Sequence, residues 1–306
     1  MAIFQAPHNP APDRAASLTE RFGVSVRPEQ IVQCHTPLRL GLAAELAEEP
    51  VLLVGRGDVK RVGESYGLRR CLTVEELALA APASVPFAGH IRRRAAQARL
   101  AGAAGDAAAL ETRTNGRPFA AILVLNDPED WYSALQISLD VVLGRGRPGV
   151  RAPRDDAAAP VHVVFCNPDM EWAAAYPTPR LGCGAFAACL EALHRRVAGR
   201  PSRGSPEKGD AAAPAAPAHY SPPALASLPL RQRFGAIFAV GDNPHADVAG
   251  ANAAGAPWVS VLVRTGVFQG AGNSPDHPAA IVVDDVAAAV RSALHRSRAA
   301  TWHSMR

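Results

Sequence analysis

Two acidic residues, Asp242 and Asp247, stand five positions apart after a short apolar run in the last third of the chain. The run at 236–240 is typical of a buried parallel strand, so Asp242 is expected at its carboxyl end. Asn243-Pro244 then turns the chain into a helix, whose first turn holds Asp247. Crevices at the carboxyl ends of parallel strands bind ligands, and carboxylate oxygens suit Mg²⁺.

This spacing predicts a Mg²⁺ site in which Asp242 is a direct ligand and Asp247 binds directly or through water. Gly241 and Asn243 are expected to form the structural turn between them. The alternative is a plain strand-turn-helix in which Asp247 only caps the helix.

The same stretch reads Gly-Asp-x4-Asp followed by Gly-Ala-x-x-Ala-Gly, which resembles the fourth motif of the haloacid dehalogenase-like (HAD) phosphohydrolases. Other runs match that family in order over residues 13–298 and point to its subfamily IIA. These runs are Cys34-His35-Thr36-Pro37, Val51-Leu52-Leu53-Val54-Gly55, Asn167-Pro168-Asp169-Met170-Glu171-Trp172, residues 179–186 and Arg264-Thr265-Gly266-Val267-Phe268-Gln269-Gly270.

The resemblance implies Mg²⁺-dependent hydrolysis of a phosphate ester through an aspartyl-phosphate, with Asp242 holding part of the metal shell. The family opens with Asp-x-Asp-Gly, which supplies the nucleophile and the acid/base, but no Asp-x-Asp occurs among these 306 residues. The family also has a Gly-Lys-Pro whose Lys neutralises the phosphoaspartate. Gly199-Arg200-Pro201 puts Arg200 in that place as a catalytic candidate; alternatively, Arg200 is a solvated linker residue.

Strand and helix patterns alternate along the chain, which favours a parallel α/β sheet. The resemblance implies a doubly wound, Rossmann-like HAD core without its first strand and an inserted α/β cap of the C2 type. We place the N-terminal part of the core at 1–115, the cap at 116–198 and the C-terminal part of the core at 199–306. Residues 202–228 are rich in Pro, Ala, Gly and Ser and are expected to be a disordered insertion.

Polar residues follow the two strands expected in the cap. Asn126 and Asp127 come after the strand at 120–125, and Asn167 and Asp169 come after the strand at 161–165. The resemblance implies that cap loops contact the substrate, so these four residues are candidate substrate contacts. Alternatively, they only cap turns and helices.

Composition excludes several classes of protein. A hydrophobic content of 48% fits a globular chain, and no apolar run is long enough to span a bilayer. The net charge of +4 is mild, and a phosphate-handling site explains it as well as nucleic acid does. The resemblance implies a small phosphorylated metabolite as partner, and we expect no nucleic acid. Five scattered cysteines, with no Cys-x-x-Cys, indicate reduced thiols in an intracellular compartment, either cytoplasm or mitochondrion. The oligomeric state stays open.

The sequence therefore favours a HAD-like phosphohydrolase-family protein whose own activity is in doubt without the Asp-x-Asp motif. A second interpretation is a catalytically inactive binding or scaffold protein that keeps the fold. A third is a fragment of a mis-started gene whose full product is an active phosphatase. If a strand is missing, the chain is expected to associate or express poorly, because a buried sheet edge would be exposed.

Overall fold

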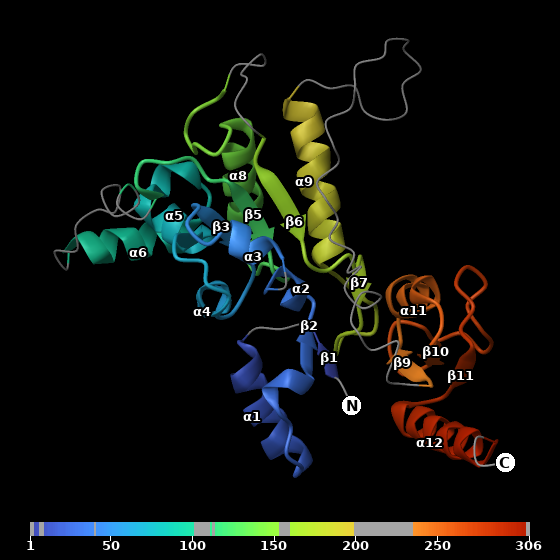
Figure 1. The fold of residues 1–306 in the computed structure, drawn as a ribbon. Helices are drawn as coiled ribbons and strands as arrows, with labels where there is room; N and C mark the ends of the chain where they lie inside the picture. Colours follow the sequence, from blue (N-terminus) through green and yellow to red (C-terminus); the bar gives the residue numbers. More distant parts are fainter. Residues whose placement is uncertain are drawn as a thin grey trace. The chain divides into compact units, whose positions relative to one another are not determined.

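The computed structural model describes residues 3–5, 9–39, 41–100, 111, 114–152, 160–198 and 235–303 (Figure 1). The chain forms two compact units. Unit 1 comprises Met1–Pro168 and Cys183–Ser221, and unit 2 comprises Asp169–Gly182 and Pro222–Arg306. Arg200 and the insertion expected at 202–228 lie outside the described residues.

Unit 1 is built on a parallel sheet with the strand order β4-β3-β5-β6. The strands are β3 (Val51–Val54), β4 (Cys71–Thr73), β5 (Ala121–Val124) and β6 (His162–Phe165). Every residue of the two central strands, β3 and β5, is buried, as expected for parallel strands covered on both faces. The sheet joins segments far apart in sequence, because β3 pairs directly with β5.

Helices cover both faces of this sheet, because successive strand residues point to opposite sides. Leu52 and Ile122 face a core shared with α5 (Val74–Ala80), α8 (Trp131–Leu143) and α9 (Cys183–Val197). Leu53 and Leu123 face a second core, shared with α2 (Thr36–Arg39), α3 (Leu42–Glu45) and α4 (Val59–Ser65). The doubly wound α/β architecture expected from the sequence is therefore confirmed.

Local signals in the sequence set several helix starts in unit 1. Thr73 and Glu76 form a capping box at α5, in which Thr73 Oγ1 accepts from the Glu76 N–H at 3.1 Å and Glu76 Oε2 accepts from the Thr73 N–H at 2.9 Å. Asp130 caps α8 by accepting from the Ser133 N–H at 3.0 Å. Such caps satisfy backbone donors that would otherwise lack partners.

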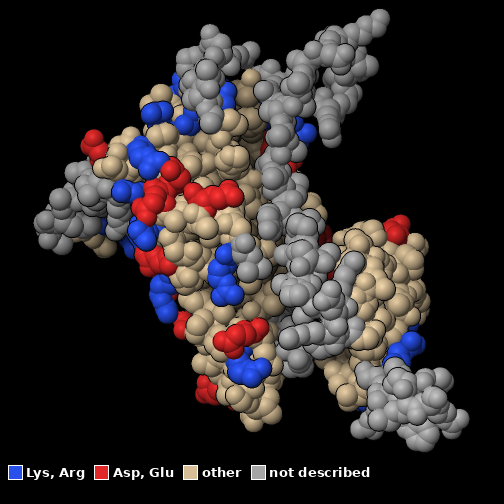
Figure 2. Space-filling model, in the orientation of Figure 1, with Lys and Arg blue, Asp and Glu red and all other residues tan. Residues whose placement is uncertain are grey.

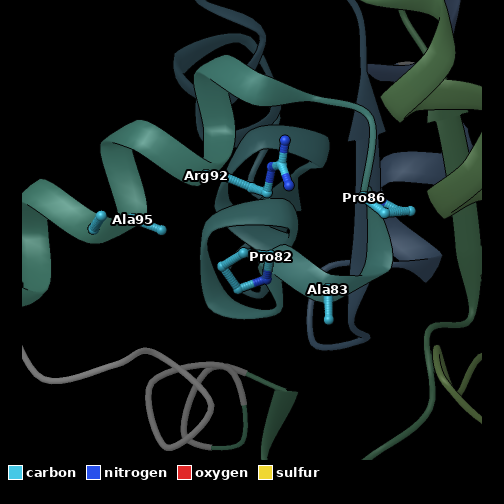
Figure 3. A pocket seen from close by; sticks show the side chains of 6 residues that line it. Pro82, Ala83, Pro86, Arg92 and Ala95 are labelled. Atoms are coloured by element: carbon cyan, nitrogen blue, oxygen red, sulfur yellow. The ribbon is translucent and has the colours of Figure 1, made fainter.

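The N-terminal part of unit 1 carries a separate pair of parallel strands. β1 (Ile3–Gln5) pairs with β2 (Ile31–Gln33), and α1 (Ala11–Phe22) and η1 (Pro28–Gln30) lie between them in sequence. After α5 come η2 (Pro82–Ser84) and α6 (Gly89–Leu100). A shallow groove of about 410 Å³ lies against η2 and α6 and is lined mainly by proline and alanine, with Arg92 beside them (Figure 3).

Basic and acidic side chains are interleaved on the face of unit 1 drawn in Figure 2. Unit 1 contains exposed ion pairs, such as Arg61 with Asp13 at 3.0 Å and Arg69 with Glu48 at 2.6 Å. Pairs of this kind contribute little to stability, typically about 0–1 kcal/mol. Each pair does place a basic side chain beside an acidic neighbour.

Unit 2 contains a parallel sheet with the order β11-β10-β9. Its strands are β9 (Ile237–Gly241), β10 (Trp258–Val263) and β11 (Ile281–Val283). Its helical segments are the π-helical turn η4 (Pro244–Val248), α11 (Ala249–Ala254) and α12 (Val286–His303). A short antiparallel pair, β7 (Glu171–Trp172) with β8 (Arg180–Leu181), belongs to the same unit.

The sheet of unit 1 runs across the boundary that we placed between residues 115 and 116. β3 and β4 precede this position, whereas β5 and β6 follow it, and all four share one hydrogen-bonded sheet. The compact units divide the chain at Pro168 and Cys183 instead. The strand and helix patterns on either side of position 115 hold no information about which strands pair, so the pattern alone could not set this boundary.

Among the described residues, no helix combines the length and the apolar character needed to cross a membrane.

Candidate functional site

Asp242 stands directly after β9, at the carboxyl end of the strand as predicted. Its carboxylate Oδ2 accepts a hydrogen bond from the Val267 N–H at 2.7 Å. Its main-chain carbonyl accepts from the Phe268 N–H at 3.0 Å. Two backbone donors from the loop after β10 therefore fix both the position of Asp242 and the direction of its side chain.

Asp247 is brought back toward Asp242 by the turn η4. Asn243 caps this turn, because its Oδ1 accepts from the His245 N–H at 3.1 Å. The Asn243 carbonyl accepts from the Asp247 N–H at 2.8 Å and from the Val248 N–H at 3.5 Å, the latter spanning five residues. Asp247 Oδ2 in turn accepts from the Asn243 N–H at 3.0 Å. The helical segment after β9 thus begins with a π turn, whereas the sequence predicted an ordinary helix start. Such π turns are often found at functional sites.

Two glycines leave the space that these carboxylates fill. A Cβ atom at Gly241 would lie 2.1 Å from Asp247 Oδ2, and a Cβ atom at Gly266 would lie 1.8 Å from Asp242 Oδ2. Both distances are far below van der Waals contact, so any larger residue displaces a carboxylate or the backbone. Gly241 therefore has a definite steric role in addition to ending the strand.

The surroundings of Asp247, including Asp242, affect its ionisation. The pKa of Asp247 is raised above its ordinary value, first because protein atoms remove water from the carboxyl and second because Asp242 carries a like charge nearby. Asp247 as a whole residue keeps contact with solvent. A cation between the two carboxylates would relieve this repulsion.

Asn243 also links the turn to the segment that carries β7 and β8. Its Nδ2 donates to Asp169 Oδ1 at 3.4 Å, within unit 2. Asp169 is one of the four predicted substrate contacts, and it alone of the four lies in the same unit as Asp242 and Asp247. The separation in sequence is 74 positions, so local patterns could not reveal this pairing.

Asn126 and Asp127 follow β5 in unit 1, and Asn167 stands near the end of β6. Asn126 is almost fully buried and holds the loop after β3: its Oδ1 accepts from the Arg56 N–H at 2.7 Å and its Nδ2 donates to the Arg56 carbonyl at 3.3 Å. Asp127 Oδ2 lies 3.9 Å from Arg56 Nη2. These contacts give Asn126 a structural role, and contact of the three residues with a substrate stays a prediction.

A buried polar pair in unit 1 was not recognised from the sequence. His35 is 1% exposed, and its Nδ1 shares a 2.7 Å hydrogen bond with the Tyr66 hydroxyl. Burial lowers the pKa of His35 to about 4 and raises the pKa of Tyr66 to about 12. The only signal was the Cys34-His35-Thr36-Pro37 run, which carries no indication of burial.

Comparison with known proteins shows similarity to one family. A family model described as HAD-hydrolase-like matches residues 210–289, which include Asp242 and Asp247. The cardiolipin synthase (CMP-forming)/mitochondrial hydrolase fusion protein of Schizosaccharomyces pombe is 32% identical over 291 residues, covering 92% of this chain and 45% of that protein. A mitochondrial hydrolase of Saccharomyces cerevisiae is 28% identical over 303 residues, covering 92% and 82%. The chain is thus similar to a HAD-hydrolase-like family over residues 210–289 and to these two yeast proteins over most of its own length.

Solved structures share the fold. A putative NagD protein has a TM-score of 0.53 at 16% identity, covering 96% of this chain and 84% of that chain. A possible sugar phosphatase of Cytophaga hutchinsonii has 0.52 at 14% identity, covering 91% and 78%. The 4-nitrophenylphosphatase of Thermotoga maritima has 0.51 at 16% identity, covering 92% and 79%. At these identities the likeness concerns the fold alone. The chain spans less than half of the fusion protein that it matches.

Proposed function

We propose that this chain supplies the cation-binding carboxylates and the substrate cap of a Mg²⁺-dependent phosphohydrolase that acts on a small phosphorylated compound. The observation that carries the proposal is the convergence of Asp242 and Asp247 at the carboxyl end of β9. The match of a HAD-hydrolase-like family model supports it, because the matched region contains both acids.

The residues of this site fit Mg²⁺. Carboxylate oxygens are the ligands that this ion prefers, usually one or two of them with water completing the shell. Within the described part of the chain, a hydrogen bond engages Oδ2 of Asp242 and none engages its Oδ1. No group of three or more His, Cys, Asp or Glu side chains gathers in the described residues, so the two acids act as a pair there.

Each residue of the turn has a distinct part in this proposal. Asp242 is the direct ligand, and Asp247 binds directly or through water. Asn243 fixes the turn that brings Asp247 back, while Gly241 and Gly266 leave room for the carboxylates. When bound, Mg²⁺ would supply positive charge to the oxygens of a phosphoryl group. The two carboxylates would fix the position of the cation.

Residues 116–198 remain the proposed cap, and β3 and β4 join β5 and β6 of this segment in one sheet. Asn126, Asp127, Asn167 and Asp169 remain the candidate substrate contacts. Arg200 remains the candidate cation in the place of the family Lys. A small phosphorylated substrate is supported by the phosphatases among the structural relatives, whose named substrates differ from one another.

The second candidate function is binding without catalysis. It is favoured by one observation, the absence of Asp-x-Asp among the 306 residues, since this motif supplies the nucleophile of the family. Both candidates keep the cation site, and turnover separates them. A mitochondrial location is proposed on the names of the two yeast relatives.

Inorganic phosphate is expected to stabilise the protein only when Mg²⁺ is present, because the cation neutralises the repulsion between phosphate and the two acids. At a hundredfold excess over Kd the gain is about 2.7 kcal/mol, which a thermal melt resolves as a rise in Tm of a few degrees. Asp242→Asn should abolish the rise, and Asp276→Asn, at an exposed acid of the same unit, should preserve it. Equal shifts in both variants would contradict the proposed role of Asp242.

A further inference from the structure

Two histidines from separate segments of unit 2 meet beside the turn that carries Asp247. His245 lies in η4, and His277 lies in the loop between β10 and β11. Their ring centroids are 5.0 Å apart, and the ring planes are inclined by 85°. The residues are 32 positions apart, so their contact is a product of the fold.

Hydrogen bonds fix the backbone at both positions. The His245 N–H donates to Asn243 Oδ1 at 3.1 Å. The His277 N–H donates to Ser274 Oγ at 3.2 Å, and Ser274 is itself buried. Asn273 closes this loop, because its Oδ1 accepts from the N–H groups of Ser274 at 2.9 Å and Ala279 at 2.8 Å. The backbone positions from which the two imidazoles project are thus set by the protein.

The separation of the two rings suits a shared metal ion. A histidine nitrogen binds Zn²⁺ at about 2.0–2.1 Å, which puts the ring centre about 3.2 Å from the metal. Two such rings at a tetrahedral angle have centres about 5 Å apart, close to the observed 5.0 Å. Imidazole prefers zinc, copper and nickel, whereas Mg²⁺ prefers oxygen ligands.

We propose that His245 and His277 form a binding site for a divalent transition cation of the zinc class. In the described part of the chain no third His, Cys, Asp or Glu side chain joins them, so water completes the shell. A cation bound there would link η4 to the β10–β11 loop. The ligand in η4, His245, lies two positions before Asp247 in sequence. It differs in chemistry from the proposed Mg²⁺ site and does not depend on Asp242.

The test is a calorimetric titration of the full chain with Zn²⁺ in excess Mg²⁺, which keeps the oxygen ligands occupied. Removal of one partner that merely orients a ligand costs about 10–100-fold in metal affinity, so loss of a ligand should cost at least as much. His245→Gln and His277→Gln should each lower the affinity for one equivalent of Zn²⁺ by at least that factor. His162→Gln, at an exposed histidine in β6, should leave it unchanged.

Two further outcomes separate this site from its neighbours. Asp242→Asn should retain the Zn²⁺ equivalent, which distinguishes the histidine pair from the proposed Mg²⁺ site. The metal-free melts of the histidine variants should match the parent, which excludes misfolding as the cause of lost binding. Zn²⁺ affinity that is the same in parent, His245→Gln and His277→Gln would overturn the inference.

Discussion

A protein consisting of residues 1–306 is expected to hydrolyse p-nitrophenyl phosphate at close to the uncatalysed rate, with or without Mg²⁺. The family nucleophile belongs to an Asp-x-Asp motif, and no such motif occurs in these residues. Loss of the nucleophile from other covalent enzymes lowers kcat by about a millionfold. Binding and charge stabilisation alone leave a residual rate that is small on this scale.

The assay compares the purified chain with Asp242→Ala and with a family phosphatase that retains the motif. The chain and its variant are expected to be equally slow, while the phosphatase turns over rapidly. Metal-dependent turnover that disappears in Asp242→Ala would show that another group in the chain acts as nucleophile. It would also decide for the enzyme over the binding protein.

The stability of the chain is expected to fall by about 3 kcal/mol between pH 6.5 and pH 4 because of His35 alone. Burial holds the pKa of His35 at about 4 in the folded state, against 6.5 for an ordinary histidine. Between these values the unfolded chain takes up a proton that the folded chain excludes. The contribution of His35 to the free energy of unfolding is therefore complete above pH 6.5 and decreases as the pH falls toward 4.

Urea unfolding at several pH values measures this effect as a difference between the parent and His35→Gln. Other groups, including Asp247 with its raised pKa, titrate in both proteins and cancel in the comparison. The parent should lose stability more steeply than His35→Gln over this interval, whereas His162→Gln should follow the parent. Parallel curves for the parent and His35→Gln would mean that His35 is accessible to protons in the folded state.

Elements set by neighbouring residues could be predicted from the sequence. The strands expected at 120–125 and 161–165 correspond to β5 (Ala121–Val124) and β6 (His162–Phe165). The strand before Asp242 was predicted within one residue of β9. In each case a short apolar run and its flanking turn residues hold the information.

Features that depend on distant contacts could not be predicted. The pairing of β3 with β5, the bond between Asn243 and Asp169, and the donor at Val267 all join residues separated along the chain. The space that Gly266 leaves for the Asp242 side chain also depends on a distant contact. The sequence shows a glycine at position 266 but does not show which side chain lies against it. The candidate acids were therefore found, while the loop that orients them was not.

The central claim is that Asp242 and Asp247 hold a divalent cation, and calorimetric titration with Mn²⁺ tests it most directly. The parent should bind, and Asp242→Asn should weaken binding by more than about tenfold. Gly266→Ala should also weaken binding, because its Cβ would occupy the place of Asp242 Oδ2. Gly272→Ala is the control: a Cβ there meets no atom within 4 Å, so this variant should bind like the parent. Equal Mn²⁺ affinity in the parent and Asp242→Asn would contradict the account.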